Sequence, residues 1–485
     1  MSNYQTPGVY VEEISTLAPS VAAVSTAIPA FIGLTKKAVK ETADDLTLVP
    51  TKIKSLVEYE ALFGKGNTEA FTVTLNDTVK EEAGDTKKLV SRAISVILSG
   101  SSSQNFMYAS IQLYFANGGG PCYVISVGDY GLSSSDLPAE LKKGLDILAA
   151  EDEPTLIVFP DAYELPDPTI YNDALAQCNK LQDRFLIMDV KTNVDGSSND
   201  ASTFREKVNS AYLKYGAAYY PDVKTTLPYN FDLTQITITQ TFKKESDGTS
   251  LNAIITEGNY KEHYYKDKKV SELKNSDKTL YNSIVEKISK FTMTVPSSGA
   301  VAGVYAQTDR NRGVWKAPAN IALNKVVAPA VKITDDTQAG LNIDATAGKS
   351  INAIRSFTGK GTLVWGARTL DGNSNEWRYI QVRRLFNYVE ESIKKSTSWA
   401  VFEANDANTH IRVKAQMESF LTGIWKAGGL VGASAAQAFF VNVGLGNTMT
   451  SQDVLEGRMH VEIGLAASRP AEFIILKFSH FIQQS

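Results

Sequence analysis

The sequence predicts an α/β fold, α+β overall, in a chain of several domains. Three observations lead to this prediction. Between residues 105 and 370, short apolar runs alternate with helix-like segments, which is typical of a parallel sheet with helices on its faces. Residues 371–485 begin with two amphipathic helical patterns and end in strand-like text. Short extended runs also stand near both ends of the chain, at 9–14 and 473–481.

The middle segment contains four apolar runs that we expect to be strands. They cover 122–127, 155–159, 185–189 and 217–220, and the second and third read as strands buried on both faces. Helical patterns at 141–150, 171–181 and 204–208 fall between them. Residues 18–34 predict the strand by which the chain enters this sheet, and residues 351–369 are expected to close it.

The last third predicts two amphipathic helices, at 379–395 and 410–425. Each places its apolar residues on one face: Val382, Leu385, Phe386, Val389 and Ile393 in the first, and Val413, Met417, Phe420, Leu421 and Ile424 in the second. The charged residues of the first helix are expected to project from its other faces. Residues 459–465 alternate in the manner of a strand, and 439–443 are expected to lie in the same sheet.

Two regions have weaker patterns. Residues 52–63 predict a helix, 68–87 a loop or hairpin, and 89–98 a second helix. Residues 225–294 are rich in Lys, Asp, Asn and Thr, so we interpret them as a surface insertion. The expected domains are an N-terminal arm with the first strand (1–35), a variable small domain (36–104), an α/β middle domain (105–370, with the insertion at about 225–294) and a C-terminal domain (371–485).

Composition excludes several classes of protein. The chain has 485 residues, 43% of them hydrophobic and 21% charged, which fits a folded protein with more than one core. Its formal net charge of −4 argues against a general nucleic-acid binder. Pro19 and Pro29 interrupt the apolar stretch 18–34, and nothing at the start resembles a signal peptide, so we expect no membrane insertion. Cys122 and Cys178 are expected to be buried thiols.

No enzyme site is expected. Ser434, in the segment GASAA, superficially resembles a nucleophilic serine, but a triad also needs a histidine base oriented by a carboxylate. Each of the four histidines lacks such a context: His263, His410, His460 and His480. Residues 64–66 (GKG) lack the spacing of a phosphate loop. We therefore predict no cofactor and no metal, and interpret three aspartates near strand ends as turn residues: Asp161, Asp189 and Asp371.

Several stretches resemble one known family. Residues 7–13 (PGVYVEE) and 20–33 (SVAAVSTAIPAFIG) look like the start of a contractile tail sheath protein. Three later stretches are similar to the C-terminal half of that family: 367–370 (ARTL), 377–385 (WRYIQVRRL) and 399–406 (WAVFEAND). The similarity is weakest over 39–103 and 225–294. It implies a phage tail or a phage-derived injection system and does not separate the two.

The resemblance implies an architecture and a mode of action. Known members have a middle domain like the subtilisin-type α/β fold and a C-terminal sheath domain, with terminal arms that exchange strands between subunits. Six subunits form a ring around an inner tube, rings stack helically, and contraction drives the tube through a target envelope. The partners implied are further copies of the chain, the inner tube protein, and baseplate and tail terminator or cap proteins, with no nucleic acid. The family implies assembly in the bacterial cytoplasm, within a phage tail or a released or anchored particle.

The sheath architecture that the resemblance implies leads us to predict residues that contact other subunits and the inner tube. The donor strands are expected to use Val9, Tyr10, Val11, Glu12 and Ile14 at one end, and Phe473, Ile475, Leu476 and Phe478 at the other. The acceptor strands are expected to contain Phe440, Val441, Val461 and Ile463. The candidate tube contact is made by Arg383, Arg384, Lys394 and Lys395, and the helix at 410–425, with Arg412, Lys414 and Lys426, is its competitor.

Two alternatives stay open. One is a different self-assembling shell or baseplate protein that uses the same terminal arms. The other is an α/β hydrolase, against which the missing histidine context argues.

Overall fold

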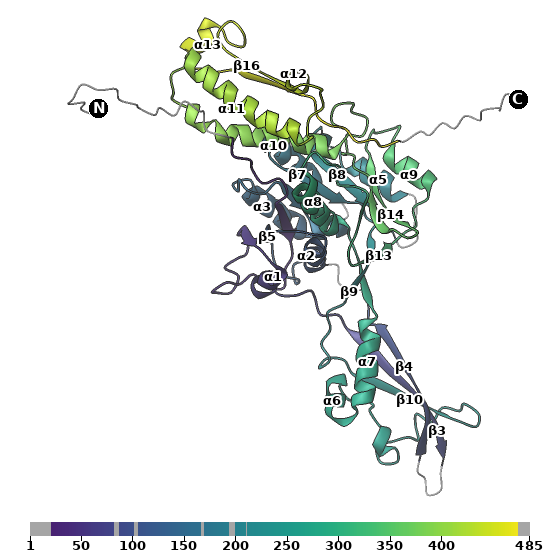
Figure 1. Ribbon diagram of the computed structural model, residues 1–485. Coiled ribbons are helices and arrows are strands. Elements are labelled where there is room, and N and C mark those ends of the chain that lie inside the picture. The colour runs from purple at the N-terminus through teal and green to yellow at the C-terminus, as the bar shows by residue number, and fades with distance from the viewer. Residues whose placement is uncertain are drawn as a thin grey trace, which may run out of the picture. The chain divides into compact units, whose positions relative to one another are not determined.

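The computed structural model describes residues 21–81, 87–100, 105–165, 169–193, 199–209 and 211–473 (Figure 1). The chain divides into two compact units. The sheet unit contains residues 26–311 and 317–380. The C-terminal unit contains residues 381–485, together with 312–316 and the start of the chain up to residue 25.

The sheet unit contains most of the strands. They are β1 (Pro29–Gly33), β2 (Thr51–Ile53), β3 (Phe71–Glu81), β4 (Lys87–Leu98), β5 (Cys122–Ser126), β6 (Leu156–Val158), β7 (Phe185–Asp189), β8 (Gly216–Tyr220), β9 (Val223–Pro228), β10 (Ile238–Lys244), β11 (Thr292–Val295), β12 (Ile321–Ala322), β13 (Val326–Pro329), β14 (Ile351–Phe357) and β15 (Gly361–Trp365). Its α-helices are α1 (Leu56–Phe63), α2 (Met107–Ala116), α3 (Leu137–Leu148), α4 (Thr169–Leu181), α5 (Asn199–Lys207), α6 (Leu273–Ser276), α7 (Lys278–Ser289), α8 (Ser298–Arg312) and α9 (Asp335–Asn342).

Nine of these strands form one mixed sheet in the order β12-β15-β14-β8-β7-β6-β1-β5-β2. The six central strands, β14 to β5 in this order, are parallel, whereas β2, β15 and β12 add antiparallel edges. The predicted strands at 122–127, 155–159, 185–189 and 217–220 are therefore confirmed as β5, β6, β7 and β8. Residues 18–34 also supply a central strand, β1, as expected.

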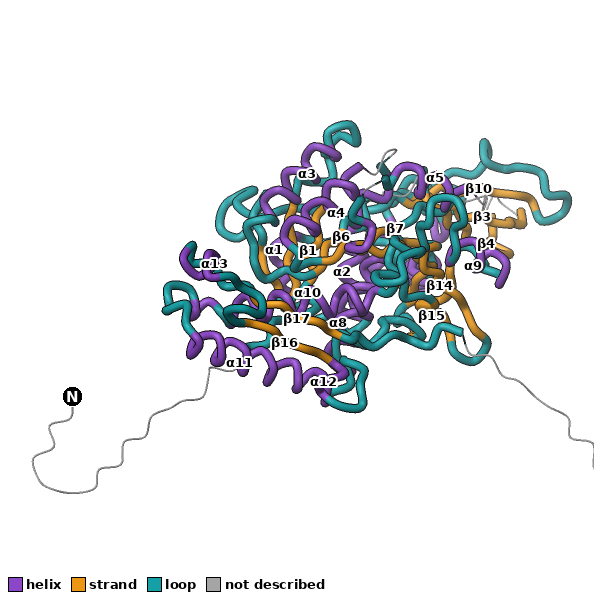
Figure 2. Tube along the Cα trace, turned by 90° about the horizontal axis from the view of Figure 1, so that it is seen from above, coloured by secondary structure: helices purple, strands orange, loops and turns teal. Residues whose placement is uncertain are grey.

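Helices cover both faces of this sheet. Along β7, Leu186 and Met188 belong to one buried cluster and Phe185 and Ile187 to another, because successive side chains of a strand point to opposite faces. The first cluster also contains residues of α3, α4, α5 and α9, and the second contains residues of α1, α2 and α8. Figure 2 shows α3 and α4 alongside β1, β6 and β7. Both cysteines are buried free thiols, as predicted.

Two of the three aspartates predicted to be turn residues bind backbone groups that are distant in the sequence. Asp161 is buried and accepts hydrogen bonds from the backbone N–H groups of Leu34 and Phe106, each at 2.6 Å. Asp189 is buried at the end of β7 and accepts a bond from Ser298 N, at the start of α8, at 2.8 Å. The turn prediction is wrong for Asp189, which ends a strand. It holds for Asp161, which lies in the turn closed by the bond from Ala162 N to Phe159 O, although its carboxylate also has partners far away in the sequence. Asp371 does occur in a turn, where its carbonyl accepts a bond from Ser374 N.

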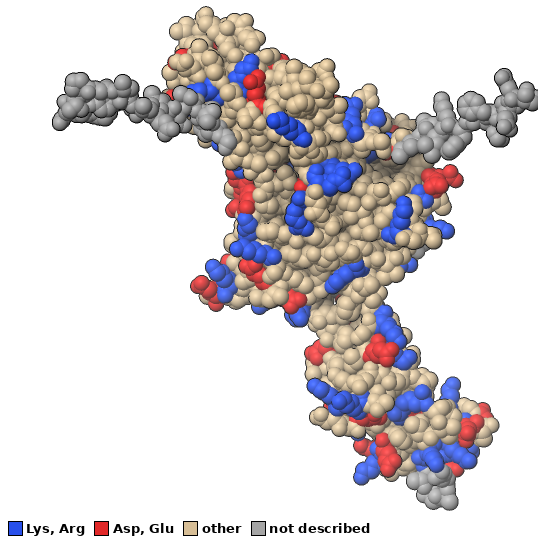
Figure 3. Space-filling model, in the orientation of Figure 1, with Lys and Arg blue, Asp and Glu red and all other residues tan. Residues whose placement is uncertain are grey.

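Residues 68–81, 87–99 and 229–291 form what we call the β3 lobe. Its sheet has the order β10-β3-β4, with β10 parallel to β3 and β4 antiparallel to it. The helix predicted at 89–98 is wrong: its apolar residues alternate with period two and pair with β3, so the segment is β4. The lobe therefore joins the two regions that we treated separately, and it has its own apolar clusters. Acidic and basic side chains are interspersed over the face drawn in Figure 3.

The C-terminal unit is built on two long helices and a small sheet. Its elements are α10 (Ile380–Ser396, which begins at the unit boundary), α11 (Ala407–Lys426), α12 (Ala435–Ala438), β16 (Phe439–Val443), α13 (Ser451–Leu455) and β17 (Val461–Leu465). One buried cluster collects the apolar faces of both long helices and of β16: Leu385, Val389, Ile393, Val413, Met417, Leu421, Ile424, Phe439 and Val441. This confirms the predicted face of the second helix, with Phe420 partly buried against the cluster, and the part of the first face that contains Leu385, Val389 and Ile393. Val382 and Phe386 do not belong to this cluster.

Candidate assembly surfaces

The sheet of the C-terminal unit has only two strands in the described part of the chain. β16 and β17 are antiparallel, in a register that pairs Phe440 with Gly464 and Val441 with Ile463. The outer edge of each strand has no described strand beside it. Since an unpaired edge presents a row of backbone N–H and C=O groups, both edges are suited to accept an added strand.

The two faces of this small sheet differ. Val441 points to the interior, against the apolar face of α11, and is 2% exposed. Phe440 points to the other face and is 47% exposed. Its ring lies across Gly464, where a Cβ atom would be 2.1 Å from Phe440 Cε1. A glycine at this position therefore lets an aromatic ring lie flat on the outward face.

The first described residues of the chain run along α10. Ala22 N donates a hydrogen bond to Ser396 Oγ at 3.0 Å, and Val24 N donates to Ser392 Oγ at 3.3 Å. We did not predict a role for these serines from the sequence. Small hydroxyl residues on a charged helix could have indicated a place where another segment of the chain binds through its backbone. They hold the segment that follows the predicted N-terminal arm.

The predicted donor strands fall largely outside the described residues. This applies to all five N-terminal positions and to Ile475, Leu476 and Phe478. Phe473 is described and is exposed. The predicted acceptor residues are brought together in one sheet, with Val461 and Ile463 partly buried on β17.

The sequence predicts that the charged residues of α10 project from the helix, but not all of them reach solvent. Arg383 is 2% exposed; its Nε donates to Asn387 Oδ1 at 2.8 Å, and its guanidinium forms an ion pair with Glu390 at 2.9 Å. Arg384 is also buried. The expectation is wrong for these two residues and for Glu391, which is 7% exposed. For Arg383 the cause is its pairing with Asn387 and Glu390 of the same helix. Lys394, by contrast, has a side chain that is 72% exposed.

The residues that a hydrolase site would use lie apart from one another. Ser434 is exposed and precedes α12, while His410 bonds to Asn405 and His460 lies 3.5 Å from Asp453. None of these three described residues therefore forms a nucleophile–base pair with another.

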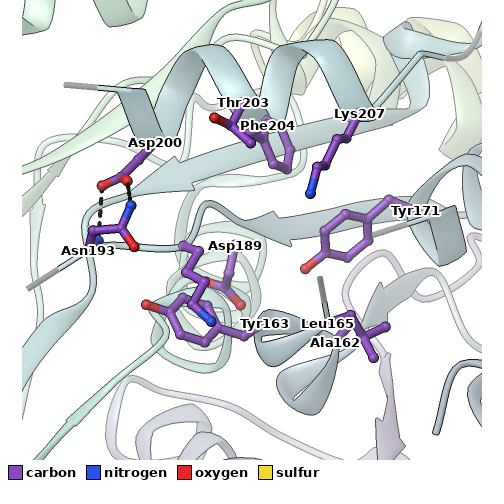
Figure 4. Close-up of a pocket in the computed structure, with 11 residues that line it drawn as sticks. Ala162, Tyr163, Leu165, Tyr171, Asp189, Asn193, Asp200, Thr203, Phe204 and Lys207 are labelled. Carbon is purple, nitrogen blue, oxygen red and sulfur yellow. Dashed lines mark hydrogen bonds between the residues drawn. The ribbon is translucent and has the colours of Figure 1, made fainter. Parts of the chain in front are cut away.

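A cavity of about 210 Å³ opens where an α/β enzyme would have its site, near the end of β7 (Figure 4). Tyr163, Tyr171 and Phe204 supply aromatic walls, and Asn193 N donates to Asp200 Oδ2 at 3.0 Å. The lining residues that the structure describes include no serine, cysteine or histidine. The described lining therefore holds no serine–histidine or cysteine–histidine pair of the kind that the hydrolase alternative requires.

The described residues contain no group of three or more His, Cys, Asp or Glu side chains arranged to hold a metal ion. In the same part of the chain, no helix combines the length and the apolar character needed to cross a membrane.

Comparison with known proteins places the chain in a family. The phage tail sheath C-terminal domain matches residues 373–480. The chain is 31% identical to a chain of the anti-feeding prophage helical sheath in its contracted state, over 98% of this chain and 99% of that one, with a TM-score of 0.63. For the PVC sheath complex of an extracellular contractile injection system, also contracted, the identity is 29%, the coverage 100% and 99%, and the TM-score 0.62.

Curated phage proteins match over a shorter stretch. The tail sheath protein of Vibrio phage KVP40 is 30% identical over 136 residues, which are 28% of this chain and 20% of the phage protein. The matched segment spans about a fifth of the length of this relative and of the tail sheath protein of Enterobacteria phage T4. All these relatives are structural proteins rather than hydrolases. The chain belongs to the tail sheath protein family of phages and contractile injection systems.

Proposed function

We propose that this chain is the subunit of a contractile sheath. Copies assemble as stacked hexameric rings around an inner tube and contract to drive the tube through a target envelope. The observation that carries the proposal is the β16–β17 sheet, which has two open edges in a chain with an extended run near each end. Membership of the sheath family supports the same function.

Strand addition gives such an assembly joints that survive contraction. A typical backbone hydrogen bond contributes only about 0.5–1.5 kcal/mol net. Several act in parallel along a strand of the length of β16 or β17, so a joint of this kind persists while weaker polar contacts between subunits are exchanged. The energy of contraction is then the difference between two packings of one set of subunits.

The whole-chain similarity favours an injection particle over a phage tail. The two sheath complexes above, at 29% and 31% identity, align with nearly all of this chain. Its further partners are then an inner tube protein, a baseplate and a cap, assembled in the bacterial cytoplasm. One related chain was solved in an anti-feeding prophage baseplate, at 30% identity.

The domain division follows from the same proposal. The nine-stranded sheet with helices on both faces supports a subtilisin-like middle domain over about 105–370, with β1 contributed by the N-terminal segment. Residues 371–485 act as the sheath domain that exchanges strands through both arms. The β3 lobe combines parts of the regions 36–104 and 225–294.

The tube contact is proposed at the C-terminal end of α10. Lys394 presents an exposed ammonium group, and Lys395 lies beside it in an ion pair with Glu391 at 3.1 Å. Arg383 and Arg384 are buried within the subunit and are therefore not part of the proposed tube contact.

Negative-stain electron microscopy of the purified chain tests the proposal. The full chain is expected to form hollow tubes, and a variant lacking residues 1–15 is expected to form none or only short ones. A variant lacking residues 1–5, which precede the predicted donor strand, is the matched control and should form normal tubes. Monodisperse monomers from the full chain at high concentration would contradict a sheath, and closed discs would favour a baseplate component.

A further inference from the structure

The loop between α10 and α11 contains an unusual turn. Glu403 N donates a hydrogen bond to Ala400 O at 3.2 Å, which closes a four-residue β-turn. Val401 has φ −68° and ψ 127°, and Phe402 has φ +69°. These angles define a type II turn, whose third position requires positive φ and is normally occupied by glycine or asparagine.

Phe402 is poorly suited to this position on two counts. A bulky side chain is strained in the left-handed region of backbone conformation. The ring also gains nothing from the fold, because the residue is 103% exposed, and the preceding Val401 is 62% exposed. Leu48 has a similar φ of +57°, but its side chain is partly buried against the core. Two adjacent apolar side chains thus stand in solvent at the tip of a turn.

The turn is firmly supported on both sides. Before it, Trp399 Nε1 donates to Gln416 Oε1 at 2.8 Å, and the guanidinium of Arg412 lies 4.3 Å from the centre of the Trp399 indole. After it, Asp406 caps α11 by accepting a bond from Thr409 N. A preorganised turn loses little conformational entropy on binding, so apolar groups at its tip are suited to a protein contact.

The residues that follow the turn indicate which partner Phe402 contacts. Asn405 Nδ2 donates to the carbonyl of Arg458 at 3.0 Å, and Arg458 lies three residues before β17. The turn is therefore continuous with the acceptor sheet. A neighbouring copy that adds a strand beside β17 would approach the segment to which this loop is bonded.

We infer that Phe402, with Val401, anchors the contact between neighbouring copies of this chain by filling an apolar recess on the copy that donates a strand to β16–β17. This inference rests on the proposed sheath function. In the free subunit, this position has a strained backbone and an exposed ring. Burial of the ring in the assembly offsets this free-energy cost, and aromatic residues are common anchors of interfaces.

The test uses substitutions that separate assembly from folding. Glycine accepts φ +69° without strain, so Phe402→Gly should leave the melting temperature of the unassembled subunit unchanged or raise it by a few degrees. The same variant should raise the concentration needed for tube formation, measured by light scattering and microscopy, by about tenfold or more. Phe402→Leu restores an apolar side chain and should recover most of the assembly. Val57→Ala, at an exposed valine of α1, is the matched control and should leave assembly unchanged.

The outcomes separate this inference from the function on which it rests. Normal tubes from Phe402→Gly would overturn the anchor role and leave the sheath function standing. Absence of tubes from the unaltered chain would instead contradict the sheath function. A lowered melting temperature of the unassembled Phe402→Gly subunit would overturn the inference too, because Phe402 would then stabilise the subunit itself.

Discussion

Asp161 holds the end of β1 through Leu34: its carboxylate oxygen Oδ2 lies 2.6 Å from Leu34 N. The neighbouring Gly33 makes this approach possible, since a Cβ atom there would be 2.3 Å from Asp161 Oδ2 and 3.1 Å from Met107 Cε. The same carboxylate accepts a bond from Phe106 N at the start of α2. One buried side chain thus joins three segments of the sheet unit.

Gly33→Ala should therefore destabilise the sheet unit. The added methyl group displaces the carboxylate from its backbone donors, and overpacking of this kind typically costs about 1–3 kcal/mol. Gly340→Ala is the matched control: the position is in α9, nothing lies within 4 Å of its Cβ, and alanine favours a helix. Urea unfolding of the unassembled subunit measures the free energy of unfolding of both variants. Equal stability of Gly33→Ala and the unaltered chain would show that the carboxylate can move freely.

Acid should stabilise the same region. Burial raises the pKa of Asp161 and of Asp189 to about 6, above the value near 4 of an unfolded chain. The folded state then binds these protons more tightly, so their contribution to stability is complete below about pH 4 and is lost as the pH rises through about 6. The free energy of unfolding of the unaltered chain, minus that of Asp161→Asn, should fall over this window. A difference that rises with pH would contradict the raised pKa.

The contact between Phe440 and Gly464 can be tested by a double-mutant cycle. Gly464→Ala should displace the aromatic ring from the outward face of the β16–β17 sheet, because the Cβ position is 2.1 Å from it. In a Phe440→Ala background the same change should cost less, by about 0.5–1 kcal/mol, since alanine leaves room for the methyl group. Urea unfolding of the unaltered chain, the two single variants and the double variant gives the coupling free energy between Phe440 and Gly464. Additive effects would show that the ring does not need the glycine.

The β3 lobe should unfold locally when its buried charge is broken. Arg92 contacts both carboxylate oxygens of Asp77 at 2.7 Å, and Gln240 and Tyr260 donate to Asp77 as well. Asp77→Ala leaves the Arg92 charge without this partner, a change that typically costs about 3–5 kcal/mol. Hydrogen exchange should increase in β3, β4 and β10. Protection in β7 should be retained, and its loss would show that the lobe and the main sheet unfold together.

Charge reversal on α10 tests the proposed tube contact. Lys394→Glu combined with Lys395→Glu should leave sheath tubes able to form while reducing co-purification with the inner tube protein. Lys414→Glu provides the comparison on α11, where Lys414 lies 3.8 Å from Glu418. If only the α11 variant loses the tube, the contact belongs to that helix instead.

Local patterns were enough to predict much of the fold. The runs that became β6 and β7 could be recognised because a strand buried on both faces is apolar throughout. The helical faces with Leu385 and Met417 could be recognised because side-chain direction repeats with period 3.6 in a helix. Motifs near both ends of the chain pointed to the sheath family, which the comparisons show.

Tertiary structure decided the features whose partners are distant in sequence. Residues 89–98 are a strand because β3 pairs with them. Asp161 joins its own segment to two others because Leu34 and Phe106 reach it only in the folded chain. Arg383 and Lys394 look alike in the sequence, yet one is buried and the other exposed. The type II turn at Phe402 was also not predicted, since its backbone angles depend on the supports around it. The burial and the pairing of a residue depend on all its neighbours in space, and the local periodicity of the sequence does not specify those neighbours.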